Sequence, residues 1–374
     1  MDPRGRAVEA ARVSGGRVWR FGVVGTGAMS ATMMECLAGH RRVAVTAVAS
    51  ADGVRARAFA ARFGIAHSHG GLAELLARDD VDAVYIATAT RDHAEHAIAA
   101  LRAGKAVLCE KPFAIDAEQG ERVLQAAEQS RRLFMEAQWT TALPAYRELL
   151  RLAGARALGE PVLLQSEFGV ALDPGSHPRL FEGEGAGVLL DFAVYPIVLA
   201  LQLMGPVRSV QAALRRNEAG VDVHASLQLT HAGGGHSQLA ASLVASLPNR
   251  TRLGCSLGHV QLDSPVMGAE ALHSQAVAPA RAAAGSGGGS KQRLVAALRS
   301  QRWLRRLKAR LSRPRASHHS FGANRYAPQL DHFVALLDAG RLDSHLMPQA
   351  TSLDVLRIVD AARLAQDAAR MGSS

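Results

Sequence analysis

Two kinds of hydrophobic pattern alternate along the first 140 residues of the chain. Short runs rich in valine, isoleucine and alanine are separated by segments whose apolar residues recur every three or four positions. The first kind is typical of buried parallel strands, and the second of amphipathic helices. The strand-like runs are Val18–Val24, Val43–Ala49, Ala83–Ala87, Ala106–Cys109 and Leu133–Glu136, and the helical segments are Met29–Ala38, Gly53–Phe63, Leu72–Ala77, Ala94–Ala103 and Ala117–Gln129. This alternation predicts an α/β fold in which helices cover both faces of a doubly wound parallel sheet.

The pattern changes after about residue 155, where longer runs alternate apolar and polar positions and few helical segments intervene. These runs are Pro161–Phe168, Val207–Leu214, Val221–Leu229, His236–Ala245 and Arg252–Leu262, and two helical segments follow at Pro328–Ala339 and Ser352–Ala369. Alternation of this kind favours a mainly antiparallel, open sheet with one exposed face. The second part of the chain is therefore expected to be an α+β domain, whose exposed sheet face makes a homodimer plausible.

Length and composition agree with two soluble domains. The chain has 374 residues, of which 48% are hydrophobic, which is enough for two sizeable cores. Its three cysteines (Cys36, Cys109 and Cys255) are too few and too scattered for a disulfide framework or a metal site, so no metal is expected. No apolar run is long enough to span a membrane, and the first residues lack the hydrophobic core of a signal peptide. We therefore expect a cytoplasmic protein.

The net charge of +10 comes from one segment of the chain. Between Glu270 and Asp331 there are twelve lysine and arginine residues and no acidic residue, so the remainder is slightly acidic. Residues 282–290 have the composition of a linker, and residues 291–311 form a helical pattern with leucine and arginine faces. A solvated insertion is favoured over contact of this helix with a nucleic acid, an anionic membrane or an acidic patch of a partner. Base stacking in particular is poorly provided for, because Trp303 is the only aromatic residue in the helix.

A glycine-rich turn follows the first predicted strand. Its residues are Gly25, Thr26, Gly27 and Ala28, and the predicted helix begins at about Met29. The glycines permit a tight turn and close backbone approach, and the helix N-terminus offers free N–H groups to a pyrophosphate. Ser30 replaces the third glycine of the dinucleotide fingerprint but is small enough to keep helix and strand close. The first half of the chain is thus predicted to be a Rossmann domain that binds a nicotinamide dinucleotide.

The end of the second strand bears on the choice between NADP and NAD. An acidic residue there would bind the ribose 2′-hydroxyl and repel a 2′-phosphate. Ser50 stands near that position, Asp52 follows two residues later, and Arg55 lies one helical turn further on. A hydroxyl and a guanidinium can both bind a phosphate, so NADP is preferred. NAD stays open, because Asp52 could fold back and Arg55 could be an ordinary solvated residue.

These patterns divide the chain into three regions. We expect a flexible tail at residues 1–17, a dinucleotide-binding domain at 18–140, and a substrate and oligomerisation domain at 141–374. The basic insert occupies about 270–325 of the last region.

Two further segments carry charged or polar groups where chemistry is expected. Glu110 and Lys111 follow a strand whose carboxyl end should face the ligand crevice, although a solvated loop pair is the simpler interpretation. Asp191 and Tyr195 are four residues apart and share a helix face, and Asp191 lies among apolar residues where an unpaired carboxylate is costly. Their alternatives are a buried capping network and a core tyrosine. Pro196 should kink that helix or mark its first turns.

Several segments together resemble the Gfo/Idh/MocA oxidoreductase family, in particular its dihydrodiol dehydrogenase-like branch. The similar segments are the Glu-Lys-Pro motif within 104–112, residues 84–93, 133–140, 185–196 and 205–207, and Leu346–Pro348. The resemblance implies that residues 84–93, with Thr88 and His93, cradle the nicotinamide side. Glu110 is expected to contact the cofactor ribose. Gln138, Trp139, Phe168 and His177 are candidates for the substrate pocket, but each could equally be core or surface.

The resemblance also implies the reaction. Hydride would pass between a nicotinamide and a carbinol or carbonyl carbon of a sugar-like or cyclic diol substrate, with Lys111 exchanging the proton. Tyr195 would hold the same oxygen, and Asp191 would orient the substrate or tune Lys111. A desolvated Lys111 beside an oxidised nicotinamide is expected to have a lowered pKa. Where members of this branch commonly have Trp-Thr-Arg, this chain has Trp139-Thr140-Thr141, and Ala89 replaces a frequent proline, so the pocket should differ.

Two other functions remain open on the sequence alone. One is an NAD-dependent hydrolase or lyase with an internal redox cycle, and the other is a cofactor-binding regulator without chemistry. Net cofactor turnover distinguishes the first from a dehydrogenase or reductase acting on CH–OH groups. The regulator is disfavoured by the joint presence of Lys111, Asp191 and Tyr195.

Overall fold

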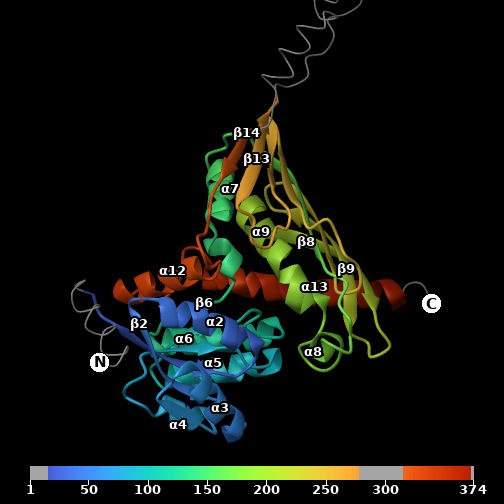
Figure 1. The fold of residues 1–374 in the computed structure, drawn as a ribbon. Coiled ribbons are helices and arrows are strands. Elements are labelled where there is room, and N and C mark those ends of the chain that lie inside the picture. The colour runs from blue at the N-terminus through green and yellow to red at the C-terminus, as the bar shows by residue number, and fades with distance from the viewer. Residues whose placement is uncertain (1–15, 278–314, 372–374) are drawn as a thin grey trace, which may run out of the picture.

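The computed structural model describes residues 16–277 and 315–371 of the chain, which build two sheets (Figure 1). The first sheet has six parallel strands in the order β3-β2-β1-β4-β5-β6, the order of a doubly wound fold. Its strands are β1 (Trp19–Val24), β2 (Val43–Ala49), β3 (His67–His69), β4 (Ala83–Ile86), β5 (Ala106–Cys109) and β6 (Phe134–Glu136). The predicted parallel sheet is confirmed.

Helices cover both faces of this sheet. One face packs against α2 (Ala28–Gly39) and α3 (Gly53–Phe63), together with α12 (Ala327–Asp338) from the far end of the chain. The other face packs against α4 (Leu72–Leu76), α5 (His93–Arg102) and α6 (Ala117–Ser130). All the strand residues of β4 and β5 are buried, because the sheet is covered from both sides.

The second sheet has eight strands in the order β14-β13-β12-β11-β7-β10-β9-β8. They are β7 (Pro161–Gly169), β8 (Val207–Arg216), β9 (Asp222–His231), β10 (His236–Ser242), β11 (Thr251–Cys255), β12 (Gly258–Leu262), β13 (Ala271–Ala276) and β14 (Arg315–His318). Among these strands only β7 and β10 pair in parallel, so the expectation of a mainly antiparallel sheet is confirmed.

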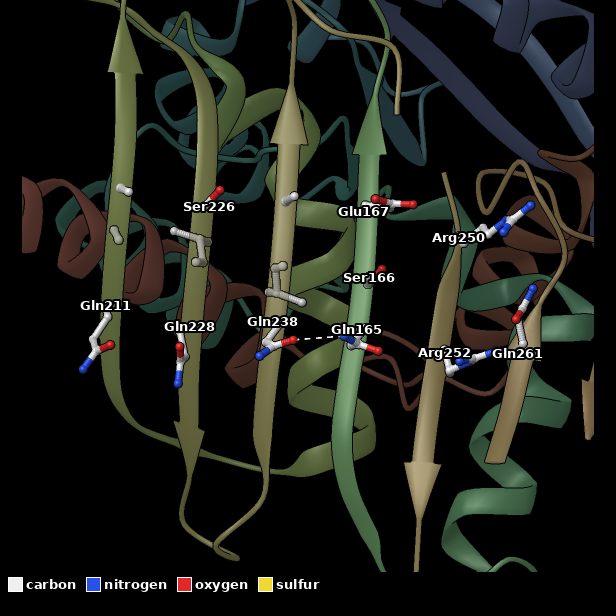
Figure 2. Close-up of a pocket in the computed structure, with 15 residues that line it drawn as sticks. Gln165, Ser166, Glu167, Gln211, Ser226, Gln228, Gln238, Arg250, Arg252 and Gln261 are labelled. Atoms are coloured by element: carbon white, nitrogen blue, oxygen red, sulfur yellow. Dashed lines mark hydrogen bonds between the residues drawn. The ribbon is translucent and has the colours of Figure 1, made fainter. Parts of the chain in front are cut away.

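One face of the second sheet is covered and the other is open. Helices α7 (Pro144–Gly154), α8 (Pro178–Phe181) and α9 (Val194–Met204) belong to the same half of the chain, and α9 packs on the covered face of the sheet. On the open face Gln211, Gln228, Gln238 and Gln165 form a row across neighbouring strands (Figure 2), and Gln165 donates a hydrogen bond of 3.0 Å to Gln238. The second sheet therefore presents a broad polar surface.

Helix α13 (Gln349–Met371) joins the two halves. It contacts α6 and β6 of the first half and α9 and β8 of the second. Figure 1 shows it running between the two sheets. In the described part of the chain no helix is long and apolar enough to cross a membrane.

The structure corrects two predicted boundaries in the second half. Arg252–Leu262 is not one strand: Cys255 pairs with Gly258, and Ser256 and Leu257 form the turn between β11 and β12. The apolar alternation continues through this turn and therefore hides it. The predicted insert at about 270–325 is also too wide, because its two ends are the antiparallel strands β13 and β14, which extend the sheet. The predicted basic helix at 291–311 lies outside the described residues, as do residues 1–15 of the predicted tail.

Candidate active site

The glycine turn after β1 is shaped by a close backbone approach. Gly25 has a φ of +105°, and a Cβ atom there would collide with the carbonyl oxygen of Ala87. Gly27 precedes the first residue of α2, and a Cβ atom on it would meet nothing within 4 Å. The turn thus leaves open space in front of the N-terminus of a twelve-residue helix, where free N–H groups and the helix dipole favour an anion. Ala28 and Met29 are the first residues of that helix, and Ser30, its third residue, is fully buried.

A cavity of about 780 Å³ lies at this turn. It is lined by Gly25, Thr26 and Gly27, by Ser50 at the end of β2 and by Thr88 after β4. Five further polar side chains line it, and sequence analysis assigned a role to only the first: Arg55, Arg91, Asp92, His96 and Arg179. Since Arg179 belongs to α8, both halves of the chain contribute to the cavity. Its glycine cradle and its cations fit a dinucleotide with a phosphate-rich backbone.

Ser50, and not Asp52, faces this cavity. The Asp52 carboxylate accepts hydrogen bonds from the backbone N–H groups of Val54 (2.8 Å) and Arg55 (3.2 Å), so it caps α3. Those two N–H groups lower the pKa of Asp52. Asp52 also pairs with the Arg55 side chain at 3.2 Å. The Asp52 carboxylate therefore bonds to the N-terminus of α3. At the end of β2, the Ser50 side chain is the one that lines the cavity.

His93 lies behind the cavity. Its Nδ1 is 2.8 Å from the carbonyl oxygen of Pro112, and its Nε2 is 3.3 Å from that of Thr88. Burial lowers the pKa of His93, which favours the neutral ring. The imidazole thus ties the turn after β4 to the loop after β5. His96, one helical turn later, is the histidine that lines the cavity, with its Nδ1 3.1 Å from the Thr88 hydroxyl.

Lys111 and Asp191 come together from different halves of the chain. Lys111 Nζ donates to Asp191 Oδ1 at 2.6 Å and to the Asp191 carbonyl oxygen at 2.8 Å. The ammonium lies 4.9 Å from the centroid of the Tyr195 ring. The side chains of Lys111 and Asp191 keep 12% and 28% of their exposure, so solvent or a ligand reaches both. The three residues proposed for catalysis therefore form one cluster.

The electrostatics of Lys111 differ from the expectation. Burial by itself lowers the pKa of the lysine, but the Asp191 carboxylate outweighs burial and raises that pKa above its ordinary value. The expectation that the pKa of Lys111 is lowered is thus wrong for the protein without cofactor, because the sequence did not reveal the direct ion pair with Asp191. Burial raises the pKa of Tyr195 to about 12, so its hydroxyl is neutral and can donate a hydrogen bond.

The local backbone explains how Asp191 is placed. Leu189–Ala193 forms a π-helical turn that runs into α9, and Pro196 stands in the first turn of α9, as the sequence predicted. The buried Asp222 carboxylate accepts a hydrogen bond of 2.7 Å from the backbone N–H of Leu189. Gly187 has a φ of +114°, and a Cβ atom there would lie 2.6 Å from Asp222 Oδ1. Asp222 thus fixes the start of the turn that carries Asp191.

Glu110 points into the protein. Its Oε1 accepts a hydrogen bond of 2.7 Å from the Tyr85 hydroxyl, and its Oε2 lies 3.3 Å from the backbone nitrogen of Lys111, which donates to it. Burial raises the pKa of Glu110. A second buried acid, Glu136 at the end of β6, accepts from the backbone N–H of Phe113 at 3.3 Å. Both carboxylates thus hold the loop that contains Lys111.

Aromatic side chains surround Tyr195. Its hydroxyl accepts a hydrogen bond of 3.4 Å from the Trp139 indole N–H, and Phe168 lies edge-on at 5.8 Å between ring centroids. Gln138 is 2% exposed, and in the described part of the chain neither end of its amide has a hydrogen-bond partner. A buried amide without partners is costly unless a ligand or water satisfies it. Trp139 and Phe168 therefore adjoin the cluster of Lys111, Asp191 and Tyr195, and Gln138 directly precedes Trp139 in the chain.

His177 is placed differently from the other pocket candidates. It is exposed, and its ring contacts the carbonyl oxygen of Asp173, four residues earlier, at 3.3 Å. This contact holds it within its own loop ahead of α8.

Sequence analysis missed Arg325 and Tyr326, which pack against Trp139 from the segment before α12. No local pattern marks them, because more than 180 residues separate them from Trp139 in the chain.

Known proteins share this architecture. Residues 19–138 match the profile of the oxidoreductase family with an NAD-binding Rossmann fold, and residues 146–261 match the C-terminal domain of Gfo/Idh/MocA proteins. This chain belongs to the Gfo/Idh/MocA family. It is accordingly an oxidoreductase whose first domain binds NAD or NADP, and the resemblance found in its sequence is confirmed.

Within the Gfo/Idh/MocA family, similar relatives include two trans-1,2-dihydrobenzene-1,2-diol dehydrogenases. The one from Xenopus tropicalis is 32% identical over 223 residues, which are 59% of this chain and 67% of the relative. The one from Bos taurus is 32% identical over 251 residues, or 66% and 74% of the two chains. The solved 3-ketoreductase KijD10 from Actinomadura kijaniata, in complex with NADP and TDP-benzene, is 25% identical with a TM-score of 0.75 over 93% of this chain and 98% of its own.

Levoglucosan dehydrogenase, in complex with NADH and levoglucosan, has the same fold at 20% identity. Its TM-score is 0.78, over 94% of this chain and 98% of its own.

Proposed function

We propose that this protein transfers a hydride between a nicotinamide and the carbinol or carbonyl carbon of a sugar-like or cyclic diol substrate. The ion pair of Lys111 with Asp191, beside Tyr195 and near Trp139, carries this proposal. Its relatives support the substrate class: the curated proteins act on a dihydrodiol by name, and the solved proteins include a 3-ketoreductase and a levoglucosan dehydrogenase.

The residues that would hold the cofactor are those around the cavity. The N-terminus of α2 and the glycine turn would bind the pyrophosphate, Ser50 and Arg55 would bind a 2′-phosphate, and Thr88 would adjoin the nicotinamide side. When bound, the nicotinamide supplies the acceptor or donor of the hydride.

Lys111 would exchange the proton. An ammonium has three N–H donors, and the two bonds to Asp191 leave the third for a substrate oxygen. In the reducing direction that N–H gives its proton to the oxygen on which negative charge develops, and in the oxidising direction the amine takes it back. The neutral Tyr195 hydroxyl would donate to the same oxygen and keep it in place.

The test is net cofactor turnover. Sugars, inositols and cyclic diols are screened with both cofactors by absorbance at the reduced nicotinamide band. Lys111→Met should lower turnover about a hundredfold or more while cofactor binding is retained, and Tyr195→Phe should lower it less. Unchanged turnover in Lys111→Met would remove the lysine from this role. Product formation without net change in cofactor would instead indicate an internal redox cycle.

Cofactor choice has its own test. We propose NADP as the preferred cofactor, because Ser50 and Arg55 line the cavity and Asp52 caps its own helix. Ser50→Asp should reverse the preference, since a carboxylate there repels a 2′-phosphate. Binding of NAD at least tenfold tighter than NADP by the unaltered protein, about 1.4 kcal/mol, would contradict the proposal.

We also propose a homodimer formed through the open face of the second sheet, in the cytoplasm. Gln165, Arg252 and Ser226 belong to this face, which is broad and polar (Figure 2). Ala240→Arg places a bulky cation at its centre and should give a monomer by light scattering. Ala232→Arg, in the turn after β9, is the matched control and should not change the mass. A monomeric unaltered protein would contradict the proposal.

A further inference from the structure

Arg325 lies against two aromatic rings at the edge of the catalytic cluster. Its guanidinium carbon is 5.2 Å from the ring centroid of Trp139 and 5.3 Å from that of Tyr326. The two rings are themselves 5.1 Å apart. Contact with both rings confines a side chain that would otherwise move freely in solvent.

The N–H groups of this guanidinium are available. Arg325 is exposed, and no carboxylate of the described residues lies within ion-pair distance of it. A guanidinium that is attracted to aromatic rings keeps N–H groups that can bind a carboxylate or phosphate. The acids of the cluster are already bonded, Asp191 to Lys111 and Glu110 to Tyr85. They do not compete for this cation.

Arg325 is one side chain away from the catalytic residues. The indole that this guanidinium lies over donates a hydrogen bond to the Tyr195 hydroxyl, and the centroid of the Tyr195 ring lies 4.9 Å from Lys111 Nζ. The residues that follow Trp139 in the sequence offer no charge: Thr140 and Thr141 are buried, and the Thr141 hydroxyl donates to the Gln138 carbonyl oxygen at 2.9 Å. The cation on this side of the tryptophan comes from the segment before α12.

We propose that Arg325 binds an anionic group of the substrate, a carboxylate or a phosphate, while the reacting carbon lies at Lys111. The enzyme would then prefer acidic sugar-like substrates over their neutral counterparts. This inference rests on the function proposed above and narrows its substrate class. A guanidinium confined beside two rings selects substrates by the position of the charge as well as by its sign.

The test compares acidic substrates with neutral counterparts from which they differ at C6 alone. A hexuronate and a hexose 6-phosphate are each measured against the neutral hexose, with NADP or NADPH. In the unaltered enzyme one acidic member should have a kcat/KM at least tenfold above its neutral counterpart. Arg325→Ala should lose that advantage tenfold or more, mainly through KM, and leave the neutral hexose within twofold. Arg325→Lys should keep part of it.

Arg62→Ala is the matched control. Arg62 is also exposed and also stacks on a ring, with its guanidinium 4.8 Å from the centroid of Phe63 on α3. This variant should behave as the unaltered enzyme. Equal kcat/KM for acidic and neutral members, or equal loss of both in Arg325→Ala, would overturn the inference, because the arginine would then only support Trp139.

A binding measurement separates this inference from the proposed function. If no tested substrate is turned over, the hydride-transfer proposal loses its support, and calorimetric titration of the NADP-loaded protein with each anion decides on Arg325. Binding that is lost in Arg325→Ala and kept in Arg62→Ala upholds the anion site. No binding of either anion overturns it.

Discussion

Lys111 Nζ and Asp191 Oδ1 are 2.6 Å apart although the two residues are 80 positions apart in the chain. The carboxylate raises the pKa of the ammonium against the effect of burial. The pKa of Lys111 therefore depends on a residue of the other half of the protein.

Asp191→Asn should move the pH dependence of the reaction. Removing the carboxylate leaves burial as the main influence, and burial lowers the pKa of Lys111. The amine then loses its proton at a lower pH, so the rising limb of kcat/KM for oxidation shifts to lower pH. Profiles measured over several pH values in both directions check this. A profile that keeps its position while only its height falls would mean that Asp191 does not tune the lysine.

Gly25→Ala and Gly27→Ala should have different effects. A Cβ on Gly25 collides with the Ala87 backbone at a positive φ, so this variant should unfold about 1–3 kcal/mol more easily without cofactor. A Cβ on Gly27 meets nothing within 4 Å and points into open space, so Gly27→Ala should keep its stability and bind the dinucleotide less tightly. Denaturant unfolding and cofactor titration separate the two. Equal stability of both variants would contradict the close approach at Gly25.

Glu136→Gln should stabilise the protein at and above neutral pH. Burial raises the pKa of Glu136 to about 7, well above its unfolded value. The folded state therefore holds a proton that the unfolded state releases, and stability falls as pH rises from the unfolded value to about 7. The amide of Glu136→Gln cannot ionise, so this loss of stability disappears. Relative to the unaltered protein, the variant should gain about 1–3 kcal/mol in the free energy of unfolding between pH 5 and pH 8.

Urea unfolding at several pH values measures this effect. Glu128→Gln, an exposed glutamate on α6, is the control and should leave the pH dependence unchanged. If Glu136→Gln and the unaltered protein lose stability in parallel, the carboxylate is already ionised in the folded state.

Removal of residues 278–314 should leave the reaction intact. Ser274 pairs with Arg315, so the strands on either side of this segment already lie side by side, and a short turn can join them. The catalytic cluster lies on other elements. The shortened protein should fold cooperatively and keep its kcat within about twofold. A loss of turnover with normal cofactor binding would instead place the segment at the substrate site.

The first half of the fold can largely be predicted from local sequence, because residues at the ends of its helices mark where the helices begin and end. Asp52 caps α3 at its start, and Gly64 ends it in a left-handed conformation. The exception is β3, whose three residues from His67 to His69 carry no apolar signal. In the second half α7 was missed, because its single helical run lies close to the point where the strand pattern begins.

The candidate site divides in the same way. The positions of Lys111, Asp191 and Tyr195 followed from family resemblance and helix spacing. The pKa of Lys111 did not, because an ion pair across the two halves depends on tertiary structure. Arg179 and Arg325 were missed for the same reason: each reaches its neighbours only after the two sheets are assembled.

Helix α13 has a consequence for the order of assembly during synthesis. It contacts elements of both halves and follows every other described element in the chain. The strands and helices around the glycine turn leave the ribosome some two hundred residues earlier. The glycine turn and the ends of β2 and β4, which line most of the dinucleotide cavity, can thus be in place before α13 contacts both halves of the chain. Nucleotide binding by the nascent chain should therefore precede competence for the proposed hydride transfer.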